Sequence, residues 1–172
     1  MTILPDPATI VNEDRADGSI YSNPDLYTME MDRIFMHNWI WVAHRSDLPD
    51  PGSFITTFIG QHPVIVSRDR NGEVHVLLNR CRHRGATVCE HKRGKAASFV
   101  CPYHGWAYGQ DGALRGVPFQ EGYSGQLDKS KHPLVSLRVE EYNGLIFATF
   151  DPDIMPLTDW LGRAKVWIDL FM

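Results

Sequence analysis

Two short segments decide how this chain folds: Asn-Arg-Cys-Arg-His-Arg-Gly at 79–85 and Cys-Pro-Tyr-His-Gly-Trp-Ala-Tyr at 101–108. Reduced to side chains that can bind a metal, they read Cys-x-His and Cys-x2-His, with seventeen residues between the two pairs. Each segment follows a predicted strand and enters a glycine-containing turn, so we expect both at the tips of hairpin loops. The candidate ligands are Cys81, His83, Cys101 and His104.

Two thiolates and two imidazoles suit either one tetrahedral zinc ion or a two-iron cluster whose irons have different ligands. In zinc fingers the closely spaced pairs are usually Cys with Cys and His with His. Here each close pair mixes one cysteine with one histidine, so each loop can give its sulfur to one metal and its nitrogen to another. The pattern therefore favours a [2Fe–2S] cluster in which two histidines bind one of the irons, the Rieske arrangement.

The residues around these segments predict a mainly β protein. Short apolar or alternating runs are separated by Asn71-Gly72, Asp111-Gly112 and Asn143-Gly144, which suit two-residue hairpins. Because no helical pattern lies between the runs, we expect an antiparallel sheet or sandwich rather than parallel βαβ units. The predicted strands are 39–43, 54–59, 64–67, 74–78, 98–100, 134–139 and 145–150.

Helical periodicity is found at both ends of the chain. Asn23 and Pro24 predict the N-cap and first turn of a helix that runs to about residue 37. Residues 157–172 predict a second helix, which ends on apolar residues without a C-cap. We therefore expect a fragment that continues into a further domain. The predicted buried stripe of this second helix consists of Leu161, Val166, Trp167 and Leu170.

Length and composition are those of a globular domain. The 172 residues are 43% hydrophobic and 22% charged, enough for one sizeable core. A net charge of -4 gives no broad basic field, so we expect no nucleic-acid partner. The longest apolar run, 144–150, is too short to cross a bilayer, and the N-terminus lacks the pattern of a secretory signal. We expect a cytoplasmic protein without a membrane partner.

The sequence also resembles a known family. The strings Cys-Arg-His-Arg-Gly and Cys-Pro-Tyr-His-Gly-Trp are similar to those of the N-terminal Rieske domain in the large (α) subunit of bacterial aromatic ring-hydroxylating dioxygenases. Arg33-Ile-Phe, Trp39 and Gly116-Val-Pro-Phe119 add to the likeness, which covers nearly the whole chain. The resemblance implies a Rieske-type sandwich of antiparallel sheets with cluster-binding hairpin loops, flanked by an N-terminal and a C-terminal helix.

The resemblance assigns the ligands and divides the chain. It implies that Cys81 and Cys101 bind one iron of a [2Fe–2S] cluster and that His83 and His104 bind the other. The expected parts are an N-terminal extension with its helix (1–38), the Rieske domain (39–152) and the start of a linker or catalytic domain (153–172).

Two aromatic residues join the expected cofactor-binding set. Respiratory-chain Rieske proteins have a disulfide between the two loops and a serine hydroxyl near a bridging sulfide. The matching positions here are Ala86, Tyr103 and Trp106, so neither feature is present. Losing a hydrogen bond to sulfur lowers the reduction potential. We expect Trp106 to lie against the cluster and Tyr108 to supply the remaining hydroxyl.

The implied function is electron transfer within a dioxygenase. Electrons would come from NADH through a reductase, a ferredoxin or both, and pass to a mononuclear non-heme iron that activates O2 for aromatic ring dihydroxylation. That Fe(II) is expected in the catalytic domain of a neighbouring α subunit, with or without a small β subunit. We expect no catalytic residue within this chain, because its other histidines show no triad pattern with a carboxylate.

Two other functions compete with this interpretation. The first is a stand-alone Rieske ferredoxin, although such carriers are typically smaller and lack flanking helices. The second, from another class, is a structural zinc-binding module with no redox role. A Rieske protein is red-brown and a zinc site is colourless, so an absorption spectrum separates the two kinds of metal site.

The remaining candidate residues are assigned structural roles. Cys89 has no partner at ligand spacing and is expected to be a packed thiol. His37 and His44 have no carboxylate nearby in sequence that would complete an iron triad, so core or surface positions are expected. A basic cluster surrounds the first segment and is either a solvated face or a docking site for an acidic electron donor. This basic cluster comprises Arg82, Arg84, Lys92, Arg93 and Lys95.

Overall fold

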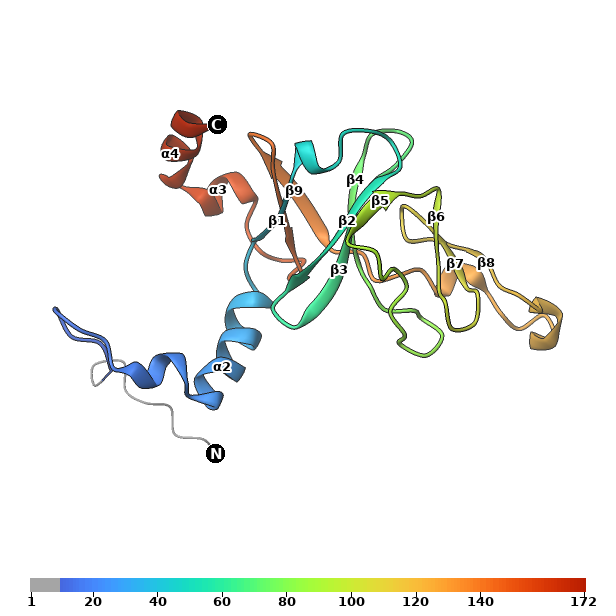
Figure 1. Ribbon diagram of the computed structural model, residues 1–172, viewed down its shortest axis with the longest axis horizontal. Coiled ribbons are helices and arrows are strands. Elements are labelled where there is room, and N and C mark those ends of the chain that lie inside the picture. Colours follow the sequence, from blue (N-terminus) through green and yellow to red (C-terminus); the bar gives the residue numbers. More distant parts are fainter. Residues whose placement is uncertain (1–9) are drawn as a thin grey trace.

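The computed structural model describes residues 10–172 and contains three antiparallel sheets (Figure 1). Their strand orders are β1-β10-β9, β4-β3-β2-β5 and β6-β7-β8. The antiparallel, mainly β architecture predicted from the turn signals is confirmed. The strands are β1 (Ile40–His44), β2 (Ser53–Ile59), β3 (His62–Arg68), β4 (Val74–Leu78), β5 (Arg93–Lys95), β6 (Ser98–Val100), β7 (Ala107–Gly109), β8 (Leu114–Gly116), β9 (Arg138–Tyr142) and β10 (Leu145–Thr149).

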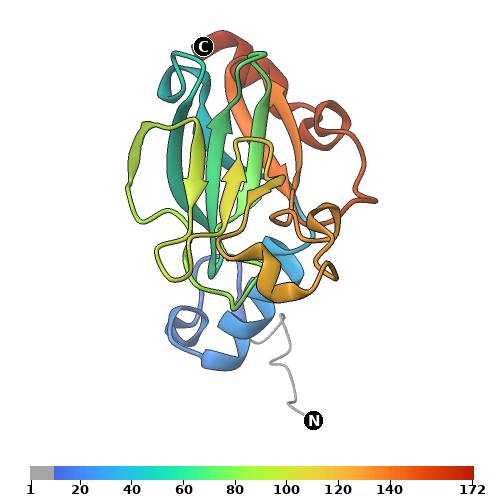
Figure 2. The same cartoon turned by 90° about the vertical axis from the view of Figure 1, so that its right-hand side faces the viewer.

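The sheet made of β6, β7 and β8 packs against the four-stranded sheet (Figure 2). One core cluster joins them, and within it Phe54 of β2 meets Phe99 of β6 edge to face, with ring centroids 5.4 Å apart. Cys81, Cys101 and Tyr108 belong to the same cluster. The two predicted ligand segments are therefore anchored in the core between these sheets.

The three predicted hairpin turns have different geometries. Asn143 and Gly144 both have positive φ, 47° and 84°, and they connect paired Tyr142 and Leu145 as a two-residue turn. The same prediction is wrong for Asn71-Gly72 and Asp111-Gly112, where only the glycine has positive φ. In these two loops an aspartate carboxylate accepts hydrogen bonds from backbone amides and widens the turn.

One predicted strand is displaced and three short strands were not predicted. The strand expected at 134–139 begins only at Arg138, because the preceding residues follow the free edge of β4 through isolated bonds. Leu78 N donates to Val135 O and Leu137 N donates to Val76 O, both over 2.8–2.9 Å. Strands β5, β7 and β8 have three residues each, too few for a recognisable alternation.

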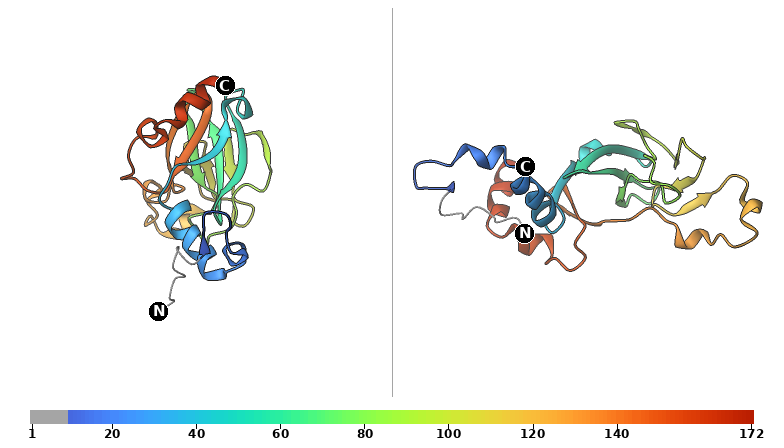
Figure 3. Two further views of the ribbon diagram at one scale, coloured as in Figure 1. Left: turned by 90° about the vertical axis from the view of Figure 1, so that its left-hand side faces the viewer. Right: turned by 90° about the horizontal axis from the view of Figure 1, so that it is seen from below.

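The α-helices lie at the end of the molecule opposite the β6-β7-β8 sheet (Figure 3), whereas the short 3-10 turns Gln120–Tyr123 and Lys129–Lys131 lie beside that sheet. The N-terminal helix is confirmed: α2 (Pro24–Glu30) is capped by Asn23, and a π turn extends it over Met31–Phe35. None of the helices in residues 10–172 has the length and apolarity needed to cross a bilayer.

The C-terminal helix prediction needs correction. Residues 157–172 form two short helices, α3 (Leu157–Leu161) and α4 (Ala164–Phe171), separated at Gly162 with φ 48°. Because the break changes the face that meets the core, Leu161 and Ile168 pack inward. The other members of the predicted stripe are exposed, namely Val166, Trp167 and Leu170.

Candidate metal centre

Two loops bring the predicted ligands together. The first ligand loop, residues 79–89, follows β4, and the second ligand loop, residues 101–106, joins β6 to β7. The second is a hairpin loop as predicted, since Val100 pairs with Ala107. The first is not, because β4 and β5 lie at opposite edges of the four-stranded sheet.

Both loops nevertheless use the same backbone turn. In the first, Cys81 N donates to Ala86 O and Gly85 N donates to Cys81 O, each over 2.8 Å. In the second, Cys101 N donates to Trp106 O and Gly105 N to Cys101 O, each over 2.9 Å. The two glycines have φ of 74° and 71°, which only glycine adopts readily.

The two thiols point into the protein. Cys81 is 4% exposed and Cys101 is 1% exposed, and the two are neighbours. Burial raises the pKa of the Cys101 thiol and the adjacent Cys81 raises it further, whereas the backbone amides of Tyr103 and His104 act in the opposite direction. The thiolate form that a metal needs therefore requires a compensating positive charge at this place.

The two histidines meet at the surface. Their Nδ1 atoms are 3.1 Å apart, and the ring centroids of His83 and His104 are 4.6 Å apart. Burial lowers the pKa of His83, and the nearby positive charges of His104 and Arg84 lower it further. His83 is thus favoured in the neutral form, which is the form that binds a metal.

The donor atoms fall into two pairs rather than one group of four. Ligands of one tetrahedral zinc would lie about 3.3–3.8 Å from one another, given zinc bond lengths. No three of the four candidate side chains bring their ligating atoms within 4.8 Å of one another. Two nitrogens 3.1 Å apart, each about 2.0–2.1 Å from a metal, would subtend about 100° there. The arrangement fits two metal centres, one at the sulfurs and one at the nitrogens, better than a single ion.

Aromatic side chains enclose this pair of histidines. Trp106, 3% exposed, stacks on His83 with centroids 5.0 Å apart and planes 9° from parallel. Tyr103 is exposed, and its ring centroid lies 3.8 Å from the ring centroid of His104. His132 and Trp106 meet edge to face, with ring centroids 5.9 Å apart. One imidazole is therefore shielded by a buried indole and the other by an aromatic ring at the surface.

Tyr108 lies on the sulfur side of the site. It is fully buried, and its hydroxyl is 3.2 Å from Cys81 Sγ while accepting a bond from Arg82 N at 3.0 Å. Burial and the contact with Cys81 raise the pKa of Tyr108 above its ordinary value. The hydroxyl consequently keeps its proton and can donate it to a thiolate at position 81.

Two residues at the site were not assigned a role from the sequence. The side-chain amide of Asn79 is 2% exposed and bonds to the backbone at the far end of the first ligand loop. For Tyr103 the sequence indicates only that it stands where respiratory-chain Rieske proteins have a cysteine. The signal that could have found Asn79 is its position directly after the apolar end of the strand Val74–Leu78, because an amide buried there needs hydrogen-bond partners.

The other cysteine and histidine candidates make contacts of a different kind. Cys89 is a buried thiol, and burial raises its pKa. His37 contacts Asp151 at 3.3 Å, and the side chain of His44 bonds within its own turn to Ser46. In the basic cluster, Lys95 pairs with Asp50, whereas the other four residues form no ion pair within residues 10–172.

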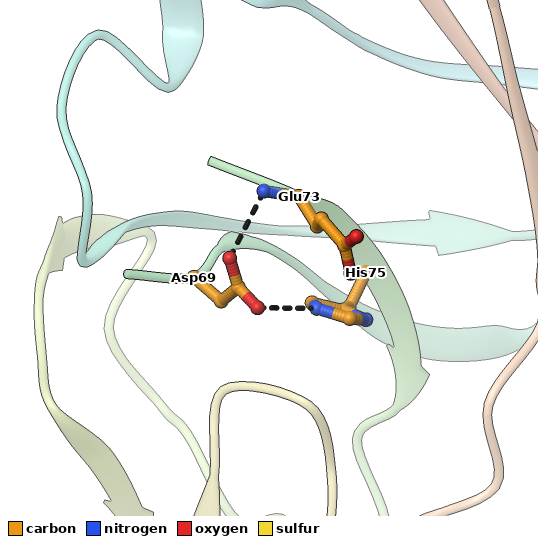
Figure 4. A group of neighbouring side chains, drawn as sticks. All are labelled: Asp69, Glu73 and His75. Atoms are coloured by element: carbon orange, nitrogen blue, oxygen red, sulfur yellow. Dashed lines mark hydrogen bonds and ion pairs between the residues drawn. The ribbon is translucent and has the colours of Figure 1, made fainter. Parts of the chain in front are cut away.

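Figure 4 shows a second group of potential ligands, made of Asp69 and Glu73 in the loop between β3 and β4 and His75 near the start of β4. Asp69 Oδ1 accepts bonds from the backbone amides of Asn71 and Glu73, and Asp69 Oδ2 is 3.2 Å from His75 Nε2. These bonds satisfy the carboxylate and hold the wide turn. The group is explained by the turn alone.

Comparison with known proteins gives a consistent family. The family model described as "Rieske [2Fe-2S] domain" matches residues 38–142. The chain is 44% identical over 166 residues to biphenyl 2,3-dioxygenase subunit alpha of Rhodococcus jostii, covering 95% of this chain and 36% of that protein. It is 41% identical to benzene 1,2-dioxygenase subunit alpha of Pseudomonas putida, covering 90% of this chain and 34% of that protein. It thus spans about a third of the length of these relatives.

Solved structures share the fold as well. The naphthalene 1,2-dioxygenase of a Rhodococcus species, bound to indole, is 39% identical with a TM-score of 0.86 over 90% of this chain and 36% of that chain. A quaternary ammonium Rieske monooxygenase in complex with L-carnitine is 29% identical with a TM-score of 0.80 over 88% of this chain and 43% of that chain. The same fold therefore occurs in proteins whose names differ in both reaction and substrate.

Proposed function

This chain belongs to the Rieske [2Fe–2S] domain family, and we propose that it stores and transfers single electrons through a cluster held by Cys81, Cys101, His83 and His104. The supporting observation is the separation of its donor atoms into a buried sulfur pair and an exposed nitrogen pair. A [2Fe–2S] cluster bound there supplies one-electron chemistry at a potential above that of all-cysteine ferredoxins.

The protein's own residues make the sulfur side and the histidine side of the site different. The buried thiols and Tyr108 keep water from the sulfur side, and the hydroxyl of Tyr108 stabilises negative charge on Cys81. His104 is exposed, so the pair His83 and His104, the histidine edge, is the part of the site that a partner can approach. We assign electron entry and exit to this histidine edge.

The surface beside the histidine edge favours an acidic electron donor. Every second residue from 80 to 84 in the first ligand loop is an exposed arginine, namely Arg80, Arg82 and Arg84. None of these three forms an ion pair within residues 10–172. Three unneutralised arginines make this loop positive although the chain has a net charge of -4. Charge complementarity of this kind steers association more than it strengthens the complex. A ferredoxin or an NADH-dependent reductase with an acidic face fits it.

We extend the proposal to the whole protein as the large subunit of a ring-hydroxylating dioxygenase. Its electrons would serve a mononuclear Fe(II) in the catalytic domain of a neighbouring subunit, with or without a small β subunit. The support is the naming of the relatives as α subunits of biphenyl and benzene dioxygenases. The division into 1–38, 39–152 and 153–172 stays part of this proposal, and so does a cytoplasmic location.

The chain of 172 residues is expected to take up electrons without oxygenating a substrate. Non-heme iron that activates O2 typically has two histidines and a carboxylate with open positions. Outside the metal centre, Asp69, Glu73 and His75 are the only group of three potential ligands within residues 10–172, and they include a single histidine.

Spectroscopy of the purified, iron-loaded protein tests the proposal. We expect a red-brown protein with two irons and two sulfides, whose EPR signal appears only after one-electron reduction. A colourless protein that binds one zinc would refute the electron-transfer function and support the structural zinc module. Supplying NADH, reductase, ferredoxin, O2 and aromatic compounds should reduce the protein without forming a hydroxylated product, and a product that depends on this chain would contradict that expectation.

A further inference from the structure

The two ligand loops have the same backbone turn but are closed in different ways. The second is closed by strand pairing, since β6 and β7 continue the ladder directly from its ends. The first has no such ladder, because β4 and β5 are separated by two other strands. Something else must hold the ends of the first ligand loop together, or its ligands would not keep a fixed position opposite the second loop.

The side chain of Asn79 provides this closure. Its Oδ1 accepts bonds from Val88 N at 3.0 Å and Cys89 N at 2.9 Å, and its Nδ2 donates to Cys89 O at 2.7 Å. One amide thus makes three bonds across the ends of the loop. It is 2% exposed, so these bonds do not exchange freely with water.

Both sides of this clamp are fixed to the rest of the protein. Asn79 N donates to Pro63 O on β3 over 2.8 Å, which ties the start of the loop to the central sheet. Val88 and Cys89 are buried in the core cluster that also contains Cys81 and Cys101. The residues between them carry Cys81 and His83, and the backbone there is tied to β7 because Arg82 N donates to the hydroxyl of Tyr108.

We propose that Asn79 is a positioning residue for the metal centre, acting through the backbone of the first ligand loop on Cys81 and His83. It does for the first loop what the β6–β7 ladder does for the second. The separation of 3.1 Å between His83 Nδ1 and His104 Nδ1 depends on it. The inference rests on the proposed function, because it concerns the same cluster.

A pair of buried amides makes a matched test. Gln110 is 6% exposed, and its Nε2 donates to Arg68 O at 3.2 Å and Ala96 O at 2.8 Å, away from the first ligand loop. We compare Asn79→Ala with Gln110→Ala in the iron-loaded protein. The measurements are the EPR spectrum after reduction, the rate of iron release to a chelator, and the melting temperature.

Both alanine variants should melt at lower temperature, because both lose buried hydrogen bonds. Only Asn79→Ala should shift and broaden the EPR features and release iron about tenfold faster, as expected when several bonds that close a loop are lost. Asn79→Asp keeps the accepting oxygen and loses the donor, so its release rate should lie between wild type and Asn79→Ala. If Asn79→Ala does not take up the cluster, comparing Asn79→Asp with wild type and with Gln110→Ala tests the positioning role instead.

The two ways of failing are distinct. Wild-type protein without a [2Fe–2S] spectrum would refute the proposed function. Wild-type protein with that spectrum, together with Asn79 variants that match Gln110→Ala in EPR and iron release, would overturn the positioning role of Asn79 alone.

Discussion

Replacing Tyr108 with phenylalanine isolates one hydrogen bond to the metal centre. The side chain is fully buried and its hydroxyl contacts Cys81 Sγ and Arg82 N, so the variant keeps the ring and loses only the hydroxyl. The lost contact is the one from the hydroxyl to Cys81 Sγ at 3.2 Å. Reduction adds negative charge to the cluster and strengthens such a bond, so its loss makes reduction harder.

The size of the effect follows from the energy of one charge-assisted bond. A hydrogen bond to a charged group contributes about 1.5–3 kcal/mol, and only the difference between the two redox states enters the potential. If about half of the bond energy differs between the redox states, the change is roughly 0.75–1.5 kcal/mol. For a one-electron couple, 59 mV corresponds to a tenfold change, so the potential should fall by about 30–65 mV.

Protein-film voltammetry of Tyr108→Phe measures this shift directly. Tyr142→Phe is the matched control, because it removes a hydroxyl that bonds Asp169 on the helical side of the molecule. The control should leave the potential unchanged. Tyr108→Phe should also melt earlier, since Arg82 N loses its acceptor at a cost of about 1–3 kcal/mol. A potential within about 10 mV of wild type, with full cluster content, would refute the reasoning for a bond of this strength.

Three further predictions concern the loops. Cys101→Ser should abolish the visible absorption of the loaded protein, whereas Cys89→Ser should keep it; the opposite result would reassign the ligand. Gly105→Ala should lower the free energy of unfolding more than Gly85→Ala. Both glycines have positive φ, costing about 1–2 kcal/mol with a Cβ, but only at 105 would that Cβ meet a proline carbon at 2.9 Å. Chemical denaturation measures the difference. Arg82→Glu should slow reduction by an acidic donor several-fold at low salt and little at high salt. Stopped-flow measurement of the reduction rate tests this, and a rate loss that does not depend on salt would exclude electrostatic steering.

The ligand set and the fold class could be predicted from the sequence because both depend on local patterns. Mixed Cys and His pairs at short spacing restrict the chemistry, and turn residues between alternating runs indicate antiparallel strands. The structure then places the Cys81 and Cys101 thiols together in the core and the histidines together at the surface. That these four residues bind the cluster stays a prediction until the ligands are replaced one by one.

The parts that could not be predicted depend on contacts between distant segments. The first ligand loop was expected to be a hairpin, but the order β4-β3-β2-β5 places its two flanking strands at opposite edges. Strand order is set by packing of whole sheets, which no window around residue 81 contains. In the same way, the sequence predicts one helix through Gly162, whereas the chain breaks there and Trp167 lies at the surface.

The order of residues within each loop explains why sulfur is inside and nitrogen outside. The cysteine lies near the start of each loop, three residues after the end of β4 in the first and one residue after the end of β6 in the second. Its amide bonds to the carbonyl of the residue five positions later, which keeps it at the base of the turn. The histidine follows two or three residues on, at the tip, before the glycine that reverses the chain. A His-x-Cys order on the same turn would put the thiolates in water and the imidazoles in the core. Oxidation follows thiolate exposure, and a partner would then meet sulfur instead of the aromatic-backed rings of His83 and His104. The sequence order Cys before His is therefore what makes the exposed edge of this site suitable for electron exchange.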